Sequence, residues 1–597
     1  MQNLVTVGTH ILNYPLRTQK TPSNLKEVKN LEAKQEKQKN CITTLLNKVA
    51  EKIFNLDESE HITIRKVQVG DKTFYKVLSE NEQHKFKGVN ITDGTEKALI
   101  DAILNESGDP SELVLTHDKV SEQMKTLVDQ FVDIENKDTL YLWSSGGGGH
   151  KSAKEAQVEK SMIMLQTQIL QRAPAQEANA FQQRFQRIEV LTDWCKQVGI
   201  FHESDVLTDY LGDIGIESVE SWDNAQKEGN VQKQELLASM QWVSDSVFAT
   251  PIYAQTLDDL IRNKPKQIIS TQAMATPAIL HAVKKYNESY KPPTDPPVIL
   301  HLYMTDMPTQ LAEHFFSSLK HMWGASAKEY LVLHAPKPKD GDTWQARADL
   351  VDWQVVELDT KEFPVRAAFF QAVQDFNPNN PITFKVSCKE ELNYLRNALK
   401  HQGAPHETMG NMDIGGIQNI NFQHNQDAHS YFLMLGSQPT KEAIKDYIDL
   451  FIMKARESPD QQFNLFAFTG KYVQGNECFY KELCNTIQQK ADWPQNLRVV
   501  PLSFQNADHI VSLELNCHSI TRSGGATIME LLVLNDACQN EKFADLPQRQ
   551  RLIHAQKIEG RSLVESIPLW ERGNFLHLQQ ELGDNLCRVV SPQENLF

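Results

Sequence analysis

Short apolar stretches alternate with longer amphipathic ones through residues 138–370. The apolar stretches are LYLW, RIEVLTDW, QIISTQ, VILHLYMTD, EYLVLHA and WQVVEL, and residues with helical spacing separate them. Strands that alternate with helices are typical of βαβ units, in which helices cover both faces of a parallel sheet. We therefore predict an α/β domain with a Rossmann-like parallel sheet over residues 138–370.

A second series of the same kind begins at Tyr431. It comprises YFLMLGSQP, FNLFAFTG, RVVPLSF and HSITRSGG, each followed by turn residues and a helical stretch. This pattern predicts a second Rossmann-like domain over residues 428–597, and a molecule in which two parallel sheets face each other. Residues 371–427 contain NPNNP near one end and a Gly-, Asn- and Gln-rich stretch near the other, and we interpret them as a linker or insertion.

Residues 1–137 show a different pattern. The stretch CITTLLNKVAEKIFNL has apolar residues at helical spacing, and HITIRKVQVGDKTFYKVLSE alternates on either side of Gly70-Asp71 as a β-hairpin does. Two further helical stretches lead to Phe131. The pattern predicts a small α+β extension, which either stabilises the next domain by packing or recognises an acceptor or a partner.

Composition narrows the class of protein. The 597-residue chain carries a formal net charge of -16, whereas nucleic-acid binders need a surplus of Lys and Arg. The eight cysteines form no CxxC pair, which predicts reduced thiols without disulfides or structural zinc. No window approaches the length of apolar sequence that spans a membrane. We expect a soluble protein without integral membrane association, located in the cytoplasm or delivered into a host cytosol.

The segment YLWSSGGGGHKSAKEA holds the first candidate site. An apolar strand leads into the glycines Gly146–Gly149, then His150, and then a helix. Glycines let the backbone approach a ligand closely, and the first N–H groups of a helix face an anion well. The spacing fits neither GxGxxG nor the Walker pattern. The segment is therefore either a phosphate-facing loop with an ionisable residue or a tight structural turn.

A similar turn stands in the second series. The strand around His518 leads into Ser523-Gly524-Gly525-Ala526-Thr527, and the helix that follows carries Glu530 in its first turns. Because ligands of open parallel sheets lie beyond the carboxyl ends of the strands, we expect the two glycine turns to line opposite walls of one cleft.

The two glycine turns together resemble a known family. SSGGGGHKSAKEA and TRSGGATIMELL are similar to the glycine-histidine loop and the donor-binding turn of GT-B glycosyltransferases, specifically the monogalactosyldiacylglycerol synthases, the processive diacylglycerol glucosyltransferases and the lipid II N-acetylglucosaminyltransferase. The segments at Met304–Thr309, Phe363–Arg366 and Pro568–Asn574 resemble further motifs of that family, in its order. Residues 371–427 are longer than the family's linker, and residues 1–137 have no counterpart in it.

The resemblance implies roles for the donor-side residues. Glu530 looks like the ribose-binding glutamate, although an acid in the first turns also stabilises a helix dipole. Glu571 and Asn574 would face the donor sugar or the nucleotide, or else cap a loop. The expected donor-binding residues, mostly phosphate neighbours, are Gly147, Gly148, Gly149, Arg522, Ser523, Gly524, Gly525 and Thr527, with Glu530, Glu571 and Asn574.

The candidates for catalysis are His150 and Asp306. A histidine titrates near neutrality, so His150 is the first candidate for general base toward an acceptor hydroxyl, against a structural role. Asp306 is the second candidate, as base or as the group that orients His150. Arg366 either contacts phosphate or holds the hinge. Helix termini and loop amides can stabilise a leaving pyrophosphate without metal, so we expect no metal and no cofactor besides the nucleotide-sugar substrate.

The sequence thus predicts a hexosyltransferase that moves a sugar from a UDP-sugar to an acceptor hydroxyl, with inversion implied by the resemblance. The alternatives are a nucleotide-sugar 2-epimerase and a non-catalytic nucleotide-sugar-binding scaffold or effector. The stretch from Glu203 to Glu228, both included, holds eight acids and only one base, Lys227. This stretch is either a solvated face or a docking surface for a soluble protein acceptor, since it would be repelled by anionic lipid.

Overall fold

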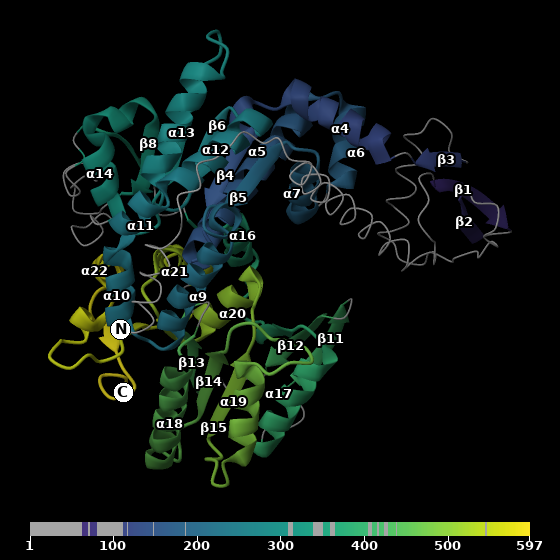
Figure 1. Ribbon diagram of the computed structural model, residues 1–597. Helices are drawn as coiled ribbons and strands as arrows, with labels where there is room; N and C mark the ends of the chain where they lie inside the picture. Colours follow the sequence, from purple (N-terminus) through teal and green to yellow (C-terminus); the bar gives the residue numbers. More distant parts are fainter. Residues whose placement is uncertain are drawn as a thin grey trace. The chain divides into compact units, whose positions relative to one another are not determined.

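The computed structural model describes residues 62–69, 72–79, 112–115, 117–146, 148–185, 187–307, 315–337, 350, 352–358, 364–403, 409–414, 417–422, 428–436, 439–543 and 546–597 (Figure 1). The chain divides into two compact units, which are described separately. The first comprises Met1–Asp133 and Ile163–Val198, and the second comprises Ile134–Met162 and Gly199–Phe597. Residues 163–198, which lie inside the predicted first Rossmann-like domain, thus group with the N-terminal residues.

The first unit contains an antiparallel sheet in the order β2-β1-β3. Its strands are β1 (Ile62–Val69), β2 (Lys72–Ser79) and β3 (Glu112–Leu115). The predicted hairpin is confirmed by the pairing of β1 with β2, although its Gly70-Asp71 turn and the CITTLLNKVAEKIFNL stretch lie outside the described residues. The helices of this unit are α4 (His117–Phe131), α6 (Ala175–Arg184), α7 (Ile188–Gln197) and the second part of α5 (Gly148–Arg172).

The prediction of a strand at RIEVLTDW was wrong. These residues lie largely in helix α7, whose buried side chains Leu191, Trp194 and Cys195 follow helical spacing. The strand next to β4 is instead β5 (Phe201–Asp205), with the sequence FHESD. It is an edge strand in which only Phe201 and Asp205 are buried, so it lacks the apolar pattern by which the other strands were recognised.

The second unit contains two parallel six-stranded sheets. The first has the order β5-β4-β6-β7-β8-β9, with β4 (Thr139–Trp143), β6 (Gln267–Ser270), β7 (Leu300–Tyr303), β8 (Leu331–Pro336) and β9 (Gln354–Leu358). Helices of this part are α8 (Thr208–Leu211), α9 (Asp213–Lys227), α10 (Val231–Ser239), α11 (Gln241–Val247), α12 (Ala249–Asn263), α13 (Thr276–Ser289) and α14 (Ser317–Trp323), with short 3-10 turns η1 (Ile134–Asn136) and η3 (Gly324–Glu329).

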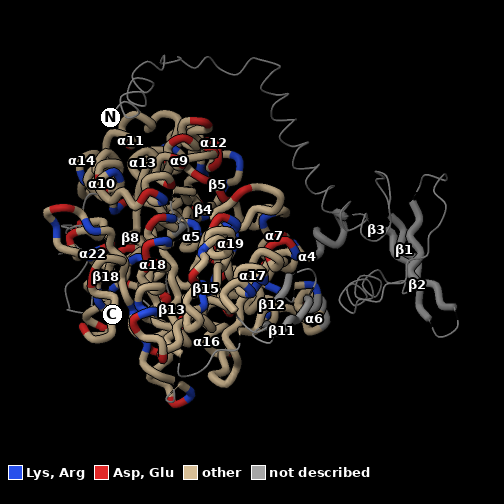
Figure 2. Tube along the Cα trace, turned by 90° about the horizontal axis from the view of Figure 1, so that it is seen from below, with Lys and Arg blue, Asp and Glu red and all other residues tan. Residues whose placement is uncertain are grey.

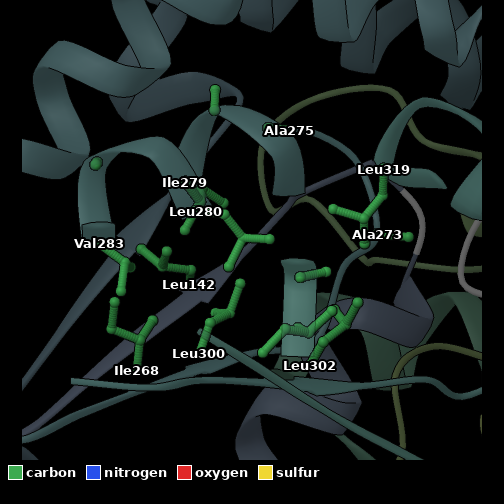
Figure 3. Close-up of a cluster of buried hydrophobic side chains, with 14 of the residues drawn as sticks. Leu142, Ile268, Ala273, Ala275, Ile279, Leu280, Val283, Leu300, Leu302 and Leu319 are labelled. Carbon is green, nitrogen blue, oxygen red and sulfur yellow. The ribbon is translucent and has the colours of Figure 1, made fainter. Parts of the chain in front are cut away.

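The apolar strand residues fix how this sheet is covered. Leu142, Ile268, Leu300 and Leu302 point from the strands toward α13, where Ile279, Leu280 and Val283 meet them (Figure 3). All seven side chains are fully buried. On the alternate positions, Tyr141 donates its hydroxyl hydrogen bond to Ser161 of α5 at 2.9 Å. Helices therefore cover both faces, as the sequence pattern predicted.

The second sheet has the order β15-β14-β13-β16-β17-β18, which is the strand order 3-2-1-4-5-6 of the Rossmann fold. Its strands are β13 (His429–Met434), β14 (Phe463–Phe468), β15 (Leu497–Leu502), β16 (His518–Thr521), β17 (Arg551–His554) and β18 (Cys587–Val590). Its helices are α16 (Ala367–Asp375), α18 (Lys441–Glu457), α19 (Phe479–Gln489), α20 (Ala507–Asn516), α21 (Gly525–Cys538) and α22 (Leu569–Leu582), with η5 (Glu541–Phe543) and η6 (Val564–Ser566).

The segment interpreted as a linker or insertion contains structure of its own. Strands β10 (Ile382–Val386), β11 (Met409–Ile414) and β12 (Ile417–Phe422) form a small antiparallel sheet, beside helix α17 (Lys389–His401). Phe384 and Phe422 of this sheet pack against Phe466 of β14 with ring centroids 6.3 and 5.1 Å apart. The segment therefore covers one face of the second parallel sheet, while α18 and α19 cover the other.

Candidate functional site

The strand orders place a switch point at the carboxyl edge of each parallel sheet. In the first sheet the chain turns opposite ways from β4, toward β5 and toward β6, and in the second it does so from β13, toward β14 and toward β16. Ligands of such sheets bind at these points. The glycine turn at residues 146–149 follows β4, and the turn at Ser523–Gly525 follows β16. Both turns thus lie at the carboxyl ends of parallel strands, as predicted.

His150 lies in the first turn of α5 and is held by the loop after β6. Its Nδ1 lies 2.6 Å from the carbonyl oxygen of Thr271, and the Thr271 hydroxyl donates to the backbone carbonyl of His150 at 2.9 Å. A carbonyl only accepts, so Nδ1 carries the proton and a neutral ring leaves its lone pair on Nε2. Burial lowers the pKa of His150, with the Thr271 bond opposing the shift. The ring is a base at neutral pH.

The glycines of this turn differ in what they contact. Gly147 lies outside the described residues, while Gly148 and Gly149 are the first residues of α5. A side chain at Gly149 would meet no heavy atom within 4 Å, and one at Gly146 would touch only Leu207, at 3.6 Å. Open space therefore lies beside Gly149, at the start of α5.

Asp306 follows β7 and is buried, but it does not hold His150. Its Oδ1 accepts a hydrogen bond of 2.8 Å from Nδ2 of Asn574, so the bond that orients His150 comes from Thr271 alone among the described contacts. Burial raises the pKa of Asp306 to about 6, the Asn574 bond lowers it, and the negative charge of Glu571 raises it. Asp306 can therefore exchange a proton close to neutral pH.

Asn574 of α22 joins the carboxyl edges of the two sheets. Besides Asp306, its Nδ2 donates to the Ser523 carbonyl at 3.0 Å, and its Oδ1 accepts from the Met307 N–H at 2.7 Å. The side chain is fully buried. Both N–H groups and the oxygen of its amide thus bind protein partners, and Asn574 ties the loop after β7 to the glycine turn after β16.

The glycine turn at α21 packs closely against the first sheet's edge. A Cβ on Gly525 would lie 2.3 Å from the carbonyl oxygen of Thr305, so only glycine fits there. One on Gly524 would meet nothing within 4 Å. Ser523 is fully buried and its hydroxyl has no hydrogen-bond partner in the part of the chain that the structure describes. The side of the helix start that stays open is therefore the one formed by Gly524 and the partly buried Thr527.

Arg522 and Glu571, both expected on the donor side, bind each other. Nη2 of Arg522 lies 2.7 Å from Oε1 of Glu571, and both side chains are largely buried. The same nitrogen approaches Oε1 of Gln234, on α10, at 3.4 Å. A ligand that recruits Arg522 must therefore compete with Glu571.

Glu530 lies in α21 opposite Arg366, at the start of α16. Burial raises the pKa of Glu530 to about 7, against the positive charge of Arg366 and with the negative charge of Glu514. Arg366 likewise lowers the pKa of Glu159 on α5, which burial raises, and its own Nε is buried without a hydrogen-bond partner among the described residues. Arg366 thus lies near both α5 and α21, the two helices that follow the glycine turns, as a hinge residue or an anion contact would.

Two residues of the loop after β6, Thr271 and Gln272, were not among the predicted site residues. Thr271 fixes the ring of His150, and both side-chain amide atoms of the buried Gln272 lack a partner in the described structure. Their position directly after a strand, the same position that singled out Asp306, was the signal available. No group of three or more His, Cys, Asp or Glu side chains in the described ranges could hold a metal ion. None of the described helices is long and apolar enough to cross a membrane.

No family model matches the chain, and no curated protein matches it either. Solved structures similar to it include MurG of Acinetobacter baumannii (10% identity, 58% of this chain and 65% of that chain, TM-score 0.28). Another is a UDP-GlcNAc 2-epimerase from Neisseria meningitidis bound to UDP-GlcNAc (11% identity, 76% of this chain and 95% of that chain, TM-score 0.31). A third is the glycosyltransferase SnogD from Streptomyces nogalater (10% identity, 75% of this chain and 94% of that chain, TM-score 0.30). The chain thus spans just under two thirds of the MurG chain. The GT-B fold class follows from the two parallel Rossmann-like sheets, whose carboxyl edges meet at Asn574.

Proposed function

We propose that the chain is a glycosyltransferase that moves a sugar from a UDP-sugar to an acceptor hydroxyl, with inversion. The observation that carries the proposal is the Asn574 tie, because it brings the loop after β7 against the glycine turn after β16. In the proposed arrangement, the base His150 after β4 and the phosphate-binding start of α21 after β16 both face the boundary between the two sheets. Such a boundary suits transfer from a nucleotide-sugar.

Each side has a stated role in this proposal. Glu530 accepts hydrogen bonds from the ribose hydroxyls, and the open start of α21 at Gly524 and Thr527 receives the diphosphate. His150 takes the proton from the acceptor hydroxyl through Nε2, because its Nδ1 is already bonded to Thr271. Backbone amides and the helix dipole stabilise the departing diphosphate, so transfer proceeds in excess EDTA.

The acceptor is proposed to be a soluble protein. The acidic stretch between Glu203 and Glu228 is partly structural, since Glu203 pairs with Lys154 at 2.8 Å and Asp205 accepts from two backbone N–H groups after β5. Two exposed acids also have partners, because Asp209 accepts from the Asp205 N–H and Glu228 pairs with Lys233 at 3.8 Å. The exposed acids Asp213, Glu217 and Glu220 lie on α9. Acidic and basic residues are otherwise interspersed over the described chain (Figure 2). A basic surface on the acceptor would complement α9.

Titration with UDP and GDP tests the nucleotide site. We expect Glu530→Ala to weaken UDP binding by about 1 to 3 kcal/mol, the cost of charge-assisted hydrogen bonds, with unchanged folding by circular dichroism. The matched control is Glu541→Ala, since Glu541 lies just beyond the other end of α21. Equal UDP affinity in wild type and Glu530→Ala would remove Glu530 from the site.

Labelled UDP-sugars incubated with a cytosolic extract test the transfer. Label on protein that depends on His150 supports the proposal. Label found solely in the organic phase would instead assign a lipid acceptor, and conversion of the UDP-sugar to its 2-epimer without an acceptor would assign an epimerase.

A further inference from the structure

A charged pocket lies where α10 meets the start of α22. It has a volume of about 250 Å³ and is lined by Glu235, Gly560, Arg561, Glu565, Leu569 and Arg572. The two helices lie beside each other (Figure 1), and Arg572 of α22 reaches Glu235 of α10. Two guanidinium groups from the second sheet's domain thus converge on one carboxylate, Glu235, from the first. None of the predicted donor or catalytic residues lines this pocket.

Glu235 fills the pocket poorly. Its Oε2 lies 3.1 Å and its Oε1 3.4 Å from the same nitrogen, Nη1 of Arg561, and Nη2 of Arg572 is 3.5 Å from Oε1. Charge-assisted pairs are normally about 2.7 to 2.9 Å long and often bidentate. The Arg522–Glu571 pair, at 2.7 Å, shows that the chain can make such a contact. The space between the two arginines is therefore wider than one carboxylate needs.

The arginines keep donors for another ligand. Arg572 is held in place through Nε, which donates to the Ile567 carbonyl at 2.9 Å, and through Nη2, which donates to the Glu565 carbonyl at 2.6 Å. Its Nη1, and Nε and Nη2 of Arg561, have no acceptor within the described part of the chain, and the two side chains remain 16% and 33% exposed. A ligand from solvent can therefore reach preset guanidinium N–H groups.

We propose that this pocket binds a phosphate dianion, and that Glu235 is an internal placeholder which the dianion displaces. A tetrahedral phosphate presents several oxygens at once, so it can engage both guanidinium groups more fully than a carboxylate does. The volume is below the usual range for drug-sized ligands, which suits inorganic phosphate or a small phosphate monoester. A side chain at Gly560 would meet no atom within 4 Å, so this wall is open to the ligand.

Calorimetric titration of the full chain with inorganic phosphate, at constant ionic strength, tests the site. Because the placeholder competes with the ligand, Glu235→Gln should bind phosphate about tenfold more tightly than wild type. Arg561→Gln and Arg572→Gln should bind it at least about tenfold more weakly. The control is Glu217→Gln, which removes the same charge from the exposed face of α9 and should stay within about twofold of wild type. Glu530→Ala should also leave phosphate binding unchanged.

The gain in Glu235→Gln keeps the test decisive even if an arginine variant fails to fold. Equal gains in Glu235→Gln and Glu217→Gln would show a net-charge effect and overturn the proposal, as would phosphate binding that survives both arginine substitutions. Glycerol 3-phosphate is the second probe: tighter binding of it than of phosphate assigns a phosphorylated small molecule, and the reverse assigns free phosphate, each in support of the site. Displacement of bound phosphate by UDP would refute a site separate from the nucleotide.

Discussion

Burial keeps His150 neutral, and the backbone carbonyl of Thr271 orients its ring. Because a carbonyl does not titrate, this orientation does not change with pH. Because burial lowers the pKa of His150 below 6.5, the base form should dominate above that pH, and kcat/KM should rise through an apparent pKa below 6.5 and then level off.

We predict that His150→Ala lowers kcat by roughly 10² to 10⁴ while nucleotide affinity stays within a few-fold. Steady-state kinetics beside a UDP titration would check this, with His321→Ala, an exposed histidine of α14, as control. A parallel loss of binding and turnover would make His150 a ligand contact instead.

Asp306 makes stability depend on pH in a defined direction. Burial raises its pKa from 3.8 to about 6, so the folded chain binds a proton more tightly than the unfolded chain does. Stability should therefore fall as pH rises from about 4 to 6 and stay lower above that, by up to roughly 3 kcal/mol from this group.

Asp306→Asn cannot ionise and can still accept from Asn574, so we expect it to flatten the pH dependence and to raise stability at pH 7. Thermal unfolding from pH 4.5 to 8 measures both effects, with Asp258→Asn, an exposed acid of α12, as the matched variant. If stability depends on pH equally in Asp306→Asn and wild type, the pKa of Asp306 is not raised by burial.

At the scale of the element, the start of α21 has two neighbouring glycines, of which Gly525 has no room for a side chain and Gly524 has ample room. A Cβ at Gly525 would overlap the Thr305 carbonyl oxygen, and no side-chain rotation relieves the overlap, because the backbone fixes the positions of both atoms. Gly524 has a φ of -62° and open space around it, which alanine accepts.

Gly525→Ala should cost about 1 to 3 kcal/mol, the usual penalty of overpacking, whereas Gly524→Ala should change the free energy of unfolding by less than about 0.5 kcal/mol. Denaturant midpoints of the two variants give the comparison. Similar midpoints for both would mean that the loop after β7 moves aside easily.

For the molecule as a whole, Asn574 links parts of the chain that are far apart in sequence. Its removal leaves the Met307 N–H and the Ser523 carbonyl without a side-chain partner, and a buried unpaired group costs about 1 to 3 kcal/mol. This cost falls where the loop after β7 meets α21 and α22, away from β13 and β14, so this contact should open before either sheet unfolds.

Asn574→Ala should therefore speed hydrogen exchange around residues 305–307 and 523–525 and leave β13 and β14 protected. The control is Asn464→Ala, whose side chain bonds Ser430 within one sheet, and which should affect that sheet alone. Uniformly faster exchange in Asn574→Ala would show that the tie stabilises a core instead of this contact.

The apolar stretches and the two glycine turns were determined by the sequence itself. Strands such as QIIS and FNLFAF are buried runs flanked by turn residues, so local pattern and turn chemistry sufficed to predict them, and with them the two parallel sheets. The same reasoning failed at β5, because FHESD is a polar edge strand, and at α7, because an apolar run of that length fits either a strand or a helix.

The partners of the site residues were decided by the tertiary structure alone. Asp306, Ser523 and Asn574 meet because the loops after β7 and β16 lie at facing sheet edges, and no local pattern encodes a bond between residues 268 positions apart. Likewise the ring of His150 is fixed by the carbonyl of Thr271, a group that every residue possesses and no side-chain motif can mark. Local periodicity specifies most of the buried elements, whereas hydrogen bonds between the ends of those elements depend on how the sheets pack.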